Sequence, residues 1–286
     1  MDQQLFRKAR AKINLSLKVV GRRPDGYHDL NTVMARLNLA DLVGLKVTAS
    51  LTSDRLNVDN KLPVALPDDF GGPGNLALKA VAAFRKKCNW PKNSVAVSLE
   101  KNIPFGAGLG GRSADCAAVL RLLNILAPQP LSRDELAELG LSLGADVPFC
   151  LSEMWIARAE GVGEKLSRPP AWADLWPGRR LVLVKPGFEL STAEVFKRLG
   201  LTKRPSDNNL GPVSDPRPGD NDLLEPALEL APALAEAREQ LAGLKPEAWG
   251  LSGSGPTFWL YGSDIPAESL FRARPDWWVR EVTIED

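Results

Sequence analysis

The chain contains 286 residues, with 36 Lys and Arg against 35 Asp and Glu, which gives a formal net charge of +1. This balance excludes a global electrostatic field favouring nucleic acid or an anionic membrane surface, so any anion must be bound by a local site. Hydrophobic residues make up 44% of the chain, as in ordinary globular proteins, and the length suffices for one large domain or two modest ones. Neither a run of about 18 apolar residues nor a signal peptide is recognisable, so we expect a cytoplasmic protein without a membrane partner.

Residue patterns predict a mixture of strands and helices along the chain. Alternating or apolar stretches predict strands at residues 45–49, 95–99, 181–184 and 257–261. Helices are predicted at 76–84 with Asn75 as N-cap, at 113–126, from the Ser132–Glu135 capping box to about 144, and at 222–244 with interruptions at Pro226 and Pro232. A polar, proline-rich stretch at 203–222 is expected to be a surface loop.

The strongest chemical signal is a glycine-rich segment, residues 101–113, placed between a predicted strand and a predicted helix. Glycines remove the side chains that would keep an anion away, and the helix N-terminus adds unpaired N–H donors, so this segment predicts a phosphate-binding loop. Gly106, Gly108 and Gly111 also match the dinucleotide pattern GxGxxG, which makes an oxidoreductase the alternative. The oxidoreductase alternative requires a strand after the helix, whereas Pro128, Pro130 and another capped helix follow. A Walker-type phosphate loop is also excluded, because no GxxxxGK pattern followed by Ser or Thr is present.

Four segments together resemble the GHMP kinase family, which is named for galactokinase, homoserine kinase, mevalonate kinase and phosphomevalonate kinase. In chain order they are residues 11–15 (AKINL), 104–114 (PFGAGLGGRSA), 144–149 (GADVPF) and 250–257 (GLSGSGPT). Residues 23–28 (RPDGYH) are similar to a segment peculiar to the diphosphocytidyl-methylerythritol kinases within that family. The sequence departs from the family at Arg112, where a third consecutive glycine is usual, and at Ala114, where a second serine is usual.

This resemblance implies a reaction and a set of site residues. The implied reaction is ATP-dependent phosphorylation of the 2-hydroxyl of 4-diphosphocytidyl-2-C-methylerythritol, in the non-mevalonate isoprenoid pathway. Asp146 is expected as general base, with Lys12 beside it to orient the carboxylate and the acceptor hydroxyl. ATP is expected to contact Asn75, Lys101, Pro104, Gly106, Gly108, Leu109, Gly110, Gly111, Arg112 and Ser113. The substrate is expected to contact Asn14, Tyr27, His28, Thr192 and Phe196, with the aromatic rings stacked on the cytosine.

Several individual residues also have simpler interpretations. Asn75 is equally consistent with a plain helix cap and Lys101 with an exposed strand end, Phe196 alone would be taken as a core aromatic, and Arg112 either contacts phosphate or points to solvent. No carboxylate cluster suggests a metal site held by the protein, so Mg²⁺ is expected to be carried mainly by the ATP phosphates.

The resemblance implies a two-domain α+β fold, with a ribosomal-protein-like N-terminal domain at residues 1–157, a ferredoxin-like C-terminal domain at residues 158–286, and the active site in the cleft between them. We expect a monomer or weak homodimer that acts on a small molecule and not on nucleic acid. A homoserine or mevalonate kinase and a non-catalytic nucleotide-binding relative remain as alternatives. The segment that contains Tyr27 and His28 argues against the first, and the presence of both Lys12 and Asp146 argues against the second.

Overall fold

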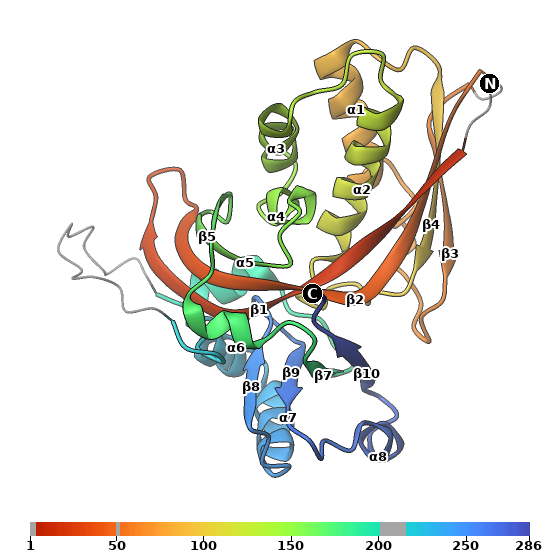
Figure 1. Ribbon diagram of the computed structural model, residues 1–286. Coiled ribbons are helices and arrows are strands. Elements are labelled where there is room, and N and C mark those ends of the chain that lie inside the picture. Colours follow the sequence, from red (N-terminus) through yellow and green to blue (C-terminus); the bar gives the residue numbers. More distant parts are fainter. Residues whose placement is uncertain (1–3, 50–51, 201–215) are drawn as a thin grey trace. The chain divides into compact units, whose positions relative to one another are not determined.

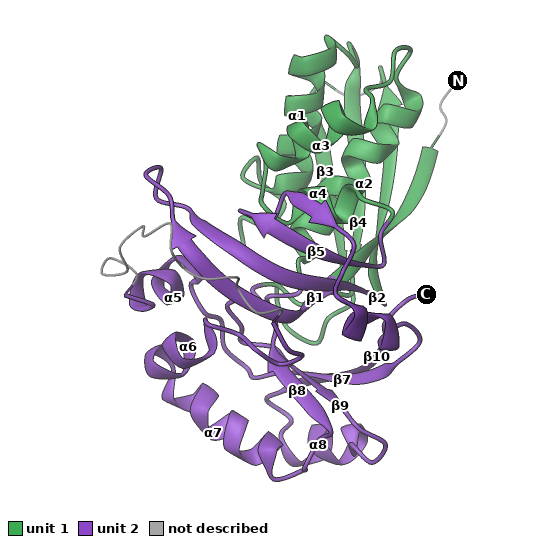
Figure 2. Cartoon of the chain, turned by 60° about the vertical axis from the view of Figure 1, so that its left-hand side comes forward, with its two compact units in different colours: residues 1–11, 39–105, 110–153 green, residues 12–38, 106–109, 154–286 purple. Residues whose placement is uncertain are grey.

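The computed structural model describes residues 4–49, 52–200 and 216–286 (Figure 1). Their helices and strands form two compact units, each assembled from segments far apart in sequence (Figure 2). Of the described residues, unit 1 contains those within 4–11, 39–105 and 110–153, and unit 2 contains those within 12–38, 106–109 and 154–286. Two long strands, β1 (Gln4–Arg22) and β2 (His28–Thr48), pair with each other, and each contributes residues to both units.

Unit 1 is a sheet covered by helices. The second half of β2 pairs antiparallel with β4 (Ser94–Lys101), and β3 (Arg55–Asn60) lies parallel to β4. The helices among its described residues are α1 (Leu76–Cys88), α2 (Gly111–Leu126), α3 (Arg133–Leu141) and α4 (Val147–Leu151). Alternate β4 residues Val95, Val97 and Leu99 are buried against α1 and α2, which gives this unit a core of its own. Helix α2 is buried along most of its length, as its apolar composition predicts.

Unit 2 contains a second sheet in the strand order β10-β7-β9-β8. Its strands are β7 (Arg180–Lys185), β8 (Ala248–Leu251), β9 (Phe258–Tyr261) and β10 (Trp278–Thr283). The helices are η1 (Ala171–Leu175), α5 (Thr192–Arg198), α6 (Leu224–Leu230), α7 (Pro232–Ala242) and α8 (Ala267–Ala273). The first half of β2 pairs with β5 (Ile156–Gly161), which continues to β6 (Lys165–Ser167).

The unit 2 sheet has two different faces. Val182, Val184, Phe258 and Leu260 pack with the buried side chains of α7 in the unit 2 core. On β9, Trp259 is fully buried and its indole N–H donates to the Asn14 carbonyl at 3.0 Å. The cross-strand neighbour of Trp259 is Gly250, and a Cβ there would lie 2.7 Å from the indole ring. Glycine at this position therefore makes room for the contact between the sheet and β1.

Most predicted elements are confirmed. Asn75 accepts from the Ala77 N–H and caps α1, and Ser132 and Glu135 make both bonds of the capping box at α3. The prediction for 222–244 is wrong in one respect. The helix breaks at Ala231, but Pro226 lies in the first turn of α6, where its missing N–H is not needed.

The remaining predictions concern larger features. Most of the predicted 203–222 loop lies outside the described residues. The fold class, two-domain α+β, is confirmed by the two sheets with their helices. The assignment of residues 1–157 and 158–286 to two domains stays a prediction. None of the helices in the described ranges combines the length and hydropathy of a membrane-spanning segment.

Candidate functional site

The glycine-rich segment connects β4 to α2, as predicted. Gly106, Gly108 and Gly110 have φ of +60°, +71° and +68°, so every second residue adopts the left-handed conformation that glycine favours. Alternation of this kind turns successive N–H groups toward one side of a loop and builds an anion-binding concavity. Helix α2 then begins at Gly111 without a side-chain cap, which leaves its first N–H groups without intrahelical acceptors. The segment has the chemistry of a phosphate-binding loop.

The part of the loop in unit 2 is packed closely against two other backbone segments. A Cβ on Gly108 would lie 2.3 Å from the carbonyl oxygen of Ser252 and 3.0 Å from that of Gly255, so no larger residue fits there. The Ser252 hydroxyl donates to the Gly108 carbonyl at 3.0 Å. The Lys12 N–H donates to the Leu109 carbonyl at 3.0 Å. Strand β1 and the 250–257 segment therefore hold this part of the loop from two sides.

A buried hydrogen-bond chain orients Lys12. Its ammonium donates to Asn14 Oδ1 at 2.8 Å, and Asn14 Nδ2 donates to the Thr32 hydroxyl at 2.8 Å. That hydroxyl in turn donates to the Ser16 carbonyl at 2.5 Å. Because the Thr32 hydroxyl must accept from the amide, the carbonyl oxygen of Asn14 faces Lys12. Lys12 is only 4% exposed, so its ammonium is surrounded by protein groups and not by solvent.

Three aromatic side chains predicted to hold a base lie in unit 2. His28 and Phe196 stack with ring centroids 4.8 Å apart and an interplanar angle of 22°. Tyr27 lies in the turn before β2 and is 63% exposed, which is unusual for a large ring and leaves it accessible to a ligand. Burial lowers the pKa of His28, and the nearby positive charge of Arg22 lowers it further. A neutral imidazole can both donate to and accept from the edge of a base.

The remaining substrate-side residue, Thr192, begins α5. Its hydroxyl is 2.8 Å from the Ser254 hydroxyl in the 250–257 segment. Asn221 also holds the same segment, because its side-chain amide donates to the carbonyls of Leu251 and Gly253 at 2.8 and 2.9 Å. All five residues predicted to contact the substrate, together with Lys12, are therefore in unit 2.

Unit 1 contains Asp146, the predicted general base. It precedes the first residue of α4, and its side chain makes no capping bond to that helix. The predicted end of the preceding helix near residue 144 is late, since α3 ends at Leu141. A Cβ on Gly144 would be 3.8 Å from the Ser113 hydroxyl, so Ser113 at the start of α2 lies close to the segment that leads to Asp146.

The other residues predicted for ATP have varied surroundings in unit 1. Arg112 is exposed, and its guanidinium carbon is 5.8 Å from the centre of the Phe105 ring. Pro104 is buried, and Asn75 caps α1. Lys101 is 2% exposed and bonds to two carboxylates, so the interpretation as an exposed strand end is wrong.

Several polar residues in these networks were not predicted from the sequence. They are Thr32, Asn221, Ser252, Ser254, and the two carboxylates bonded to Lys101, which belong to Asp41 and Asp115. A motif signal existed only for Ser252 and Ser254, which are part of the GLSGSGPT segment. Among the described residues, no three His, Cys, Asp or Glu side chains come together as a group that could hold a metal ion.

Comparisons with known proteins agree on one family. Residues 75–153 match the family model described as the GHMP kinases N terminal domain. The chain is 38% identical over 267 residues to a 4-diphosphocytidyl-2-C-methyl-D-erythritol kinase of Desulfotalea psychrophila, covering 89% of this chain and 84% of the relative. It is 40% identical over 278 residues to a protein of the same name from Geobacillus sp. strain WCH70, covering 94% and 92%. A crystal structure of 4-(cytidine 5'-diphospho)-2C-methyl-D-erythritol kinase matches with a TM-score of 0.72 and 32% identity, over 98% of this chain and 99% of the other.

Proposed function

The chain belongs to the 4-diphosphocytidyl-2-C-methyl-D-erythritol kinase family of the GHMP kinases, and we propose that it transfers the γ-phosphate of ATP to the 2-hydroxyl of 4-diphosphocytidyl-2-C-methyl-D-erythritol. The observation that carries the choice of substrate is the aromatic group of Tyr27, His28 and Phe196, placed in the same unit as Asn14 and Thr192. A stacked aromatic pair beside an exposed tyrosine suits a flat pyrimidine base. Homoserine and mevalonate have no such base to bind.

In this proposal the glycine-rich loop binds the triphosphate of ATP. Left-handed Gly106, Gly108 and Gly110 and the uncapped start of α2 supply backbone N–H donors, and the helix dipole favours the negative charge. The Ser113 hydroxyl and the Arg112 guanidinium add side-chain donors at the first turn of the helix. Pro104, Leu109 and Gly111, which are also among the predicted ATP contacts, shape this backbone.

The chemical step requires a group that removes a proton and a group that places the acceptor. The Asp146 carboxylate takes the proton of the 2-hydroxyl while the oxygen forms its bond to the γ-phosphorus. The bond from that phosphorus to the β,γ-bridging oxygen breaks, and ADP leaves with the electron pair. The Lys12 ammonium, held by Asn14 and Thr32, orients the hydroxyl and offsets the developing charge. Mg²⁺ would travel with the nucleotide and neutralise its phosphates.

The cytidine end of the substrate would be read by unit 2. Tyr27 and Phe196 stack on the ring faces, and neutral His28 bonds the polar edge of the base. The imidazole of His28 stacks on one face of Phe196, so it would compete with a base for that face. Because ATP and the cytidylyl substrate are small cytoplasmic metabolites, the proposal includes a cytoplasmic location.

A substrate panel tests this function. ADP release would be measured with 4-diphosphocytidyl-2-C-methyl-D-erythritol, homoserine and mevalonate, each against Asp146→Asn as the inactive control. We expect turnover with the cytidylyl compound alone. Turnover with homoserine or mevalonate instead would assign another GHMP activity, and ATP binding without turnover of any of the three would favour a non-catalytic relative.

A further inference from the structure

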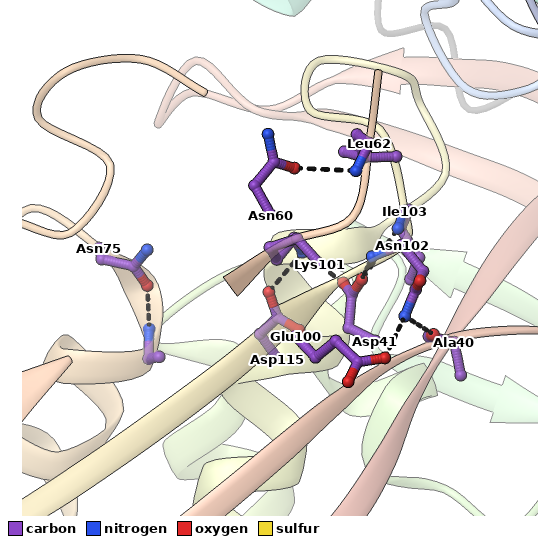
Figure 3. Close-up of polar contacts among 11 residues, drawn as sticks. Ala40, Asp41, Asn60, Leu62, Asn75, Glu100, Lys101, Asn102, Ile103 and Asp115 are labelled. Carbon is purple, nitrogen blue, oxygen red and sulfur yellow. Dashed lines mark hydrogen bonds and ion pairs between the residues drawn. The ribbon is translucent and has the colours of Figure 1, made fainter. Parts of the chain in front are cut away.

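Three buried ionisable side chains of unit 1 meet at the base of the glycine-rich loop (Figure 3). They are Asp41 from β2, Lys101 at the end of β4 and Asp115 from α2, which are 0%, 2% and 2% exposed. The Lys101 ammonium bonds to a carboxylate oxygen of Asp41 and, at 2.8 Å, to Asp115 Oδ2. The Phe70 ring, 5.9 Å away, borders the ammonium. The Lys101 ammonium bonds to the side chains of both Asp41 and Asp115 and is almost fully buried, so its partners are protein groups and not solvent.

The same cluster is bonded to the first residues of the loop. Asp41 Oδ1 accepts from the backbone N–H of Asn102 at 2.6 Å and of Ile103 at 2.8 Å, so the chain is fixed where it leaves β4. The side chain of Asn102 donates to the Ala40 carbonyl at 3.2 Å, which adds a second tie between β2 and the loop. These bonds set the direction in which the loop departs.

The far end of the loop converges on the same ammonium. A Cβ on Gly111, the first residue of α2, would lie 3.7 Å from Lys101 Nζ and 3.0 Å from the Ile103 side chain. Asp115 follows one turn later on the same helix. Lys101 therefore connects the strand that enters the loop to the helix that leaves it.

We propose that Asp41, Lys101 and Asp115 form a positioning cluster that fixes both ends of the glycine-rich loop in its phosphate-binding form, with Asp115 protonated. Lys101 then serves ATP through the loop backbone and makes no contact with the nucleotide. The inference rests on the proposed function only in taking ATP as the ligand of this loop.

Charge balance explains why the proton belongs on Asp115. Burial raises the pKa of the Asp115 carboxyl, Lys101 opposes the rise and the negative charge of Asp41 adds to it, which together bring the pKa to about 8. Burial alone would lower the pKa of the Lys101 ammonium, but Asp115 and Asp41 outweigh burial and raise it. With one ammonium, one carboxylate and one neutral carboxyl, the cluster is uncharged near neutral pH. Loss of the Asp115 proton leaves an uncompensated buried negative charge, which is unfavourable.

Among the described residues of the helices that pack on α2, no other charged group is positioned to replace Lys101 in this balance. Helix α1 turns buried Ala77, Ala80, Val81 and Phe84 inward, and its lysines are exposed. The charged residues of α3 are exposed too. The titratable residue of α4 is Cys150, and Cys116 follows Asp115 on α2; burial raises the pKa of the Cys116 thiol, so it stays neutral. Asp146, before α4, is half-buried.

Lys101→Met separates positioning from direct contact. Dissociation constants for Mg·ATP and for Mg²⁺ with inorganic tripolyphosphate would be measured by calorimetry at pH 7, with unfolding curves to verify folding. If Lys101 sets the phosphate loop, both constants should rise by the same factor, about tenfold or more. A rise for ATP alone would make Lys101 a contact of adenosine and overturn the proposal. Lys61→Met, which removes the exposed Lys61–Asp59 ion pair of the same unit, is the matched control and should change neither constant.

Asp115→Asn tests the proton without removing the hydrogen-bond acceptor. The wild-type dissociation constant for ATP should rise between pH 7 and 9, whereas that of the variant should be flat over this range. Because the folded-state pKa of Asp115 is raised above the unfolded value of 3.8, its contribution to stability is full below that pH and is lost as pH rises to about 8. The variant should therefore gain stability relative to wild type as pH rises from 5 to 8.

The outcomes are distinguishable from those of the proposed function. Equal pH dependence of ATP binding in the wild type and in Asp115→Asn would refute the role of the proton. Neither measurement involves the acceptor, so a kinase that binds ATP but rejects the cytidylyl substrate would leave this inference standing and remove the substrate assignment. If Lys101→Met weakened the binding of ATP but not of tripolyphosphate, this inference would be refuted and the substrate assignment would stand.

Discussion

Replacement of Gly108 by alanine probes the loop most directly. The added Cβ would meet the Ser252 carbonyl oxygen at 2.3 Å, and the residue has a φ of +71°. An alanine in the left-handed conformation costs about 1–2 kcal/mol, and overpacking against a well-packed neighbour costs about 1–3 kcal/mol more. We therefore expect the free energy of unfolding to fall by about 2–5 kcal/mol.

Gly178→Ala is the matched control for backbone strain. Gly178 has a φ of +74°, but a Cβ there would meet nothing within 4 Å, so only the conformational cost of about 1–2 kcal/mol applies. Activity separates the two variants further. Relief of the Gly108 clash requires a shift of roughly 1 Å, and a misplacement of that size in a catalytic site can cost about 100-fold in rate.

The assays are denaturant unfolding of both variants and steady-state kinetics with ATP and the cytidylyl substrate. Gly108→Ala should be less stable than Gly178→Ala and lose about 100-fold in kcat/KM, while Gly178→Ala keeps wild-type kinetics. Equal stability losses combined with normal kinetics for Gly108→Ala would refute both the close packing of the loop and its role in phosphate binding.

Four further substitutions test the assigned roles. Asp146→Asn keeps the shape but cannot accept a proton, so turnover should fall by about two to four orders of magnitude while calorimetry still detects ATP binding; near-normal turnover would remove Asp146 from its role. Tyr27→Ala and Phe196→Ala should each weaken binding of the cytidylyl substrate by about 1–3 kcal/mol and leave ATP affinity unchanged, and the opposite pattern would reverse the two pockets. Arg112→Gly should raise the ATP dissociation constant roughly tenfold, equivalent to about 1.4 kcal/mol, if the exposed guanidinium contacts phosphate. A neutral or tighter result at fixed salt would show that Arg112 only points to solvent.

Local signals predicted the local structure well. The Asn75 cap, the Ser132 capping box and the glycine-rich segment between a strand and a helix each depend on residues a few positions apart, and each is confirmed. The long strands β1 and β2 were largely missed. Their buried positions include Lys12, Asn14 and Thr32, so polar residues interrupt the apolar alternation that indicates a strand.

Most of the site contacts that could not be predicted from the sequence join residues that lie far apart in the chain. Lys101 is 60 residues from Asp41 and 14 from Asp115, and Ser252 is 144 residues from Gly108. No spacing rule connects such positions, because folding alone brings them together. A strand-end lysine normally remains hydrated, so burial between two carboxylates could not be inferred from its neighbours in sequence.

The interleaving of the two units has a consequence for synthesis on the ribosome. Residues 12–38 leave the exit tunnel early, but β7, β9 and β10, which complete unit 2, follow more than a hundred residues later. Until then Leu17 and Val19 of β1, which are buried in the unit 2 core with Val182, Val184 and Phe258, lack these partners. The nascent chain must therefore carry an unsatisfied apolar strand for most of translation, which makes this segment a natural binding site for a general chaperone.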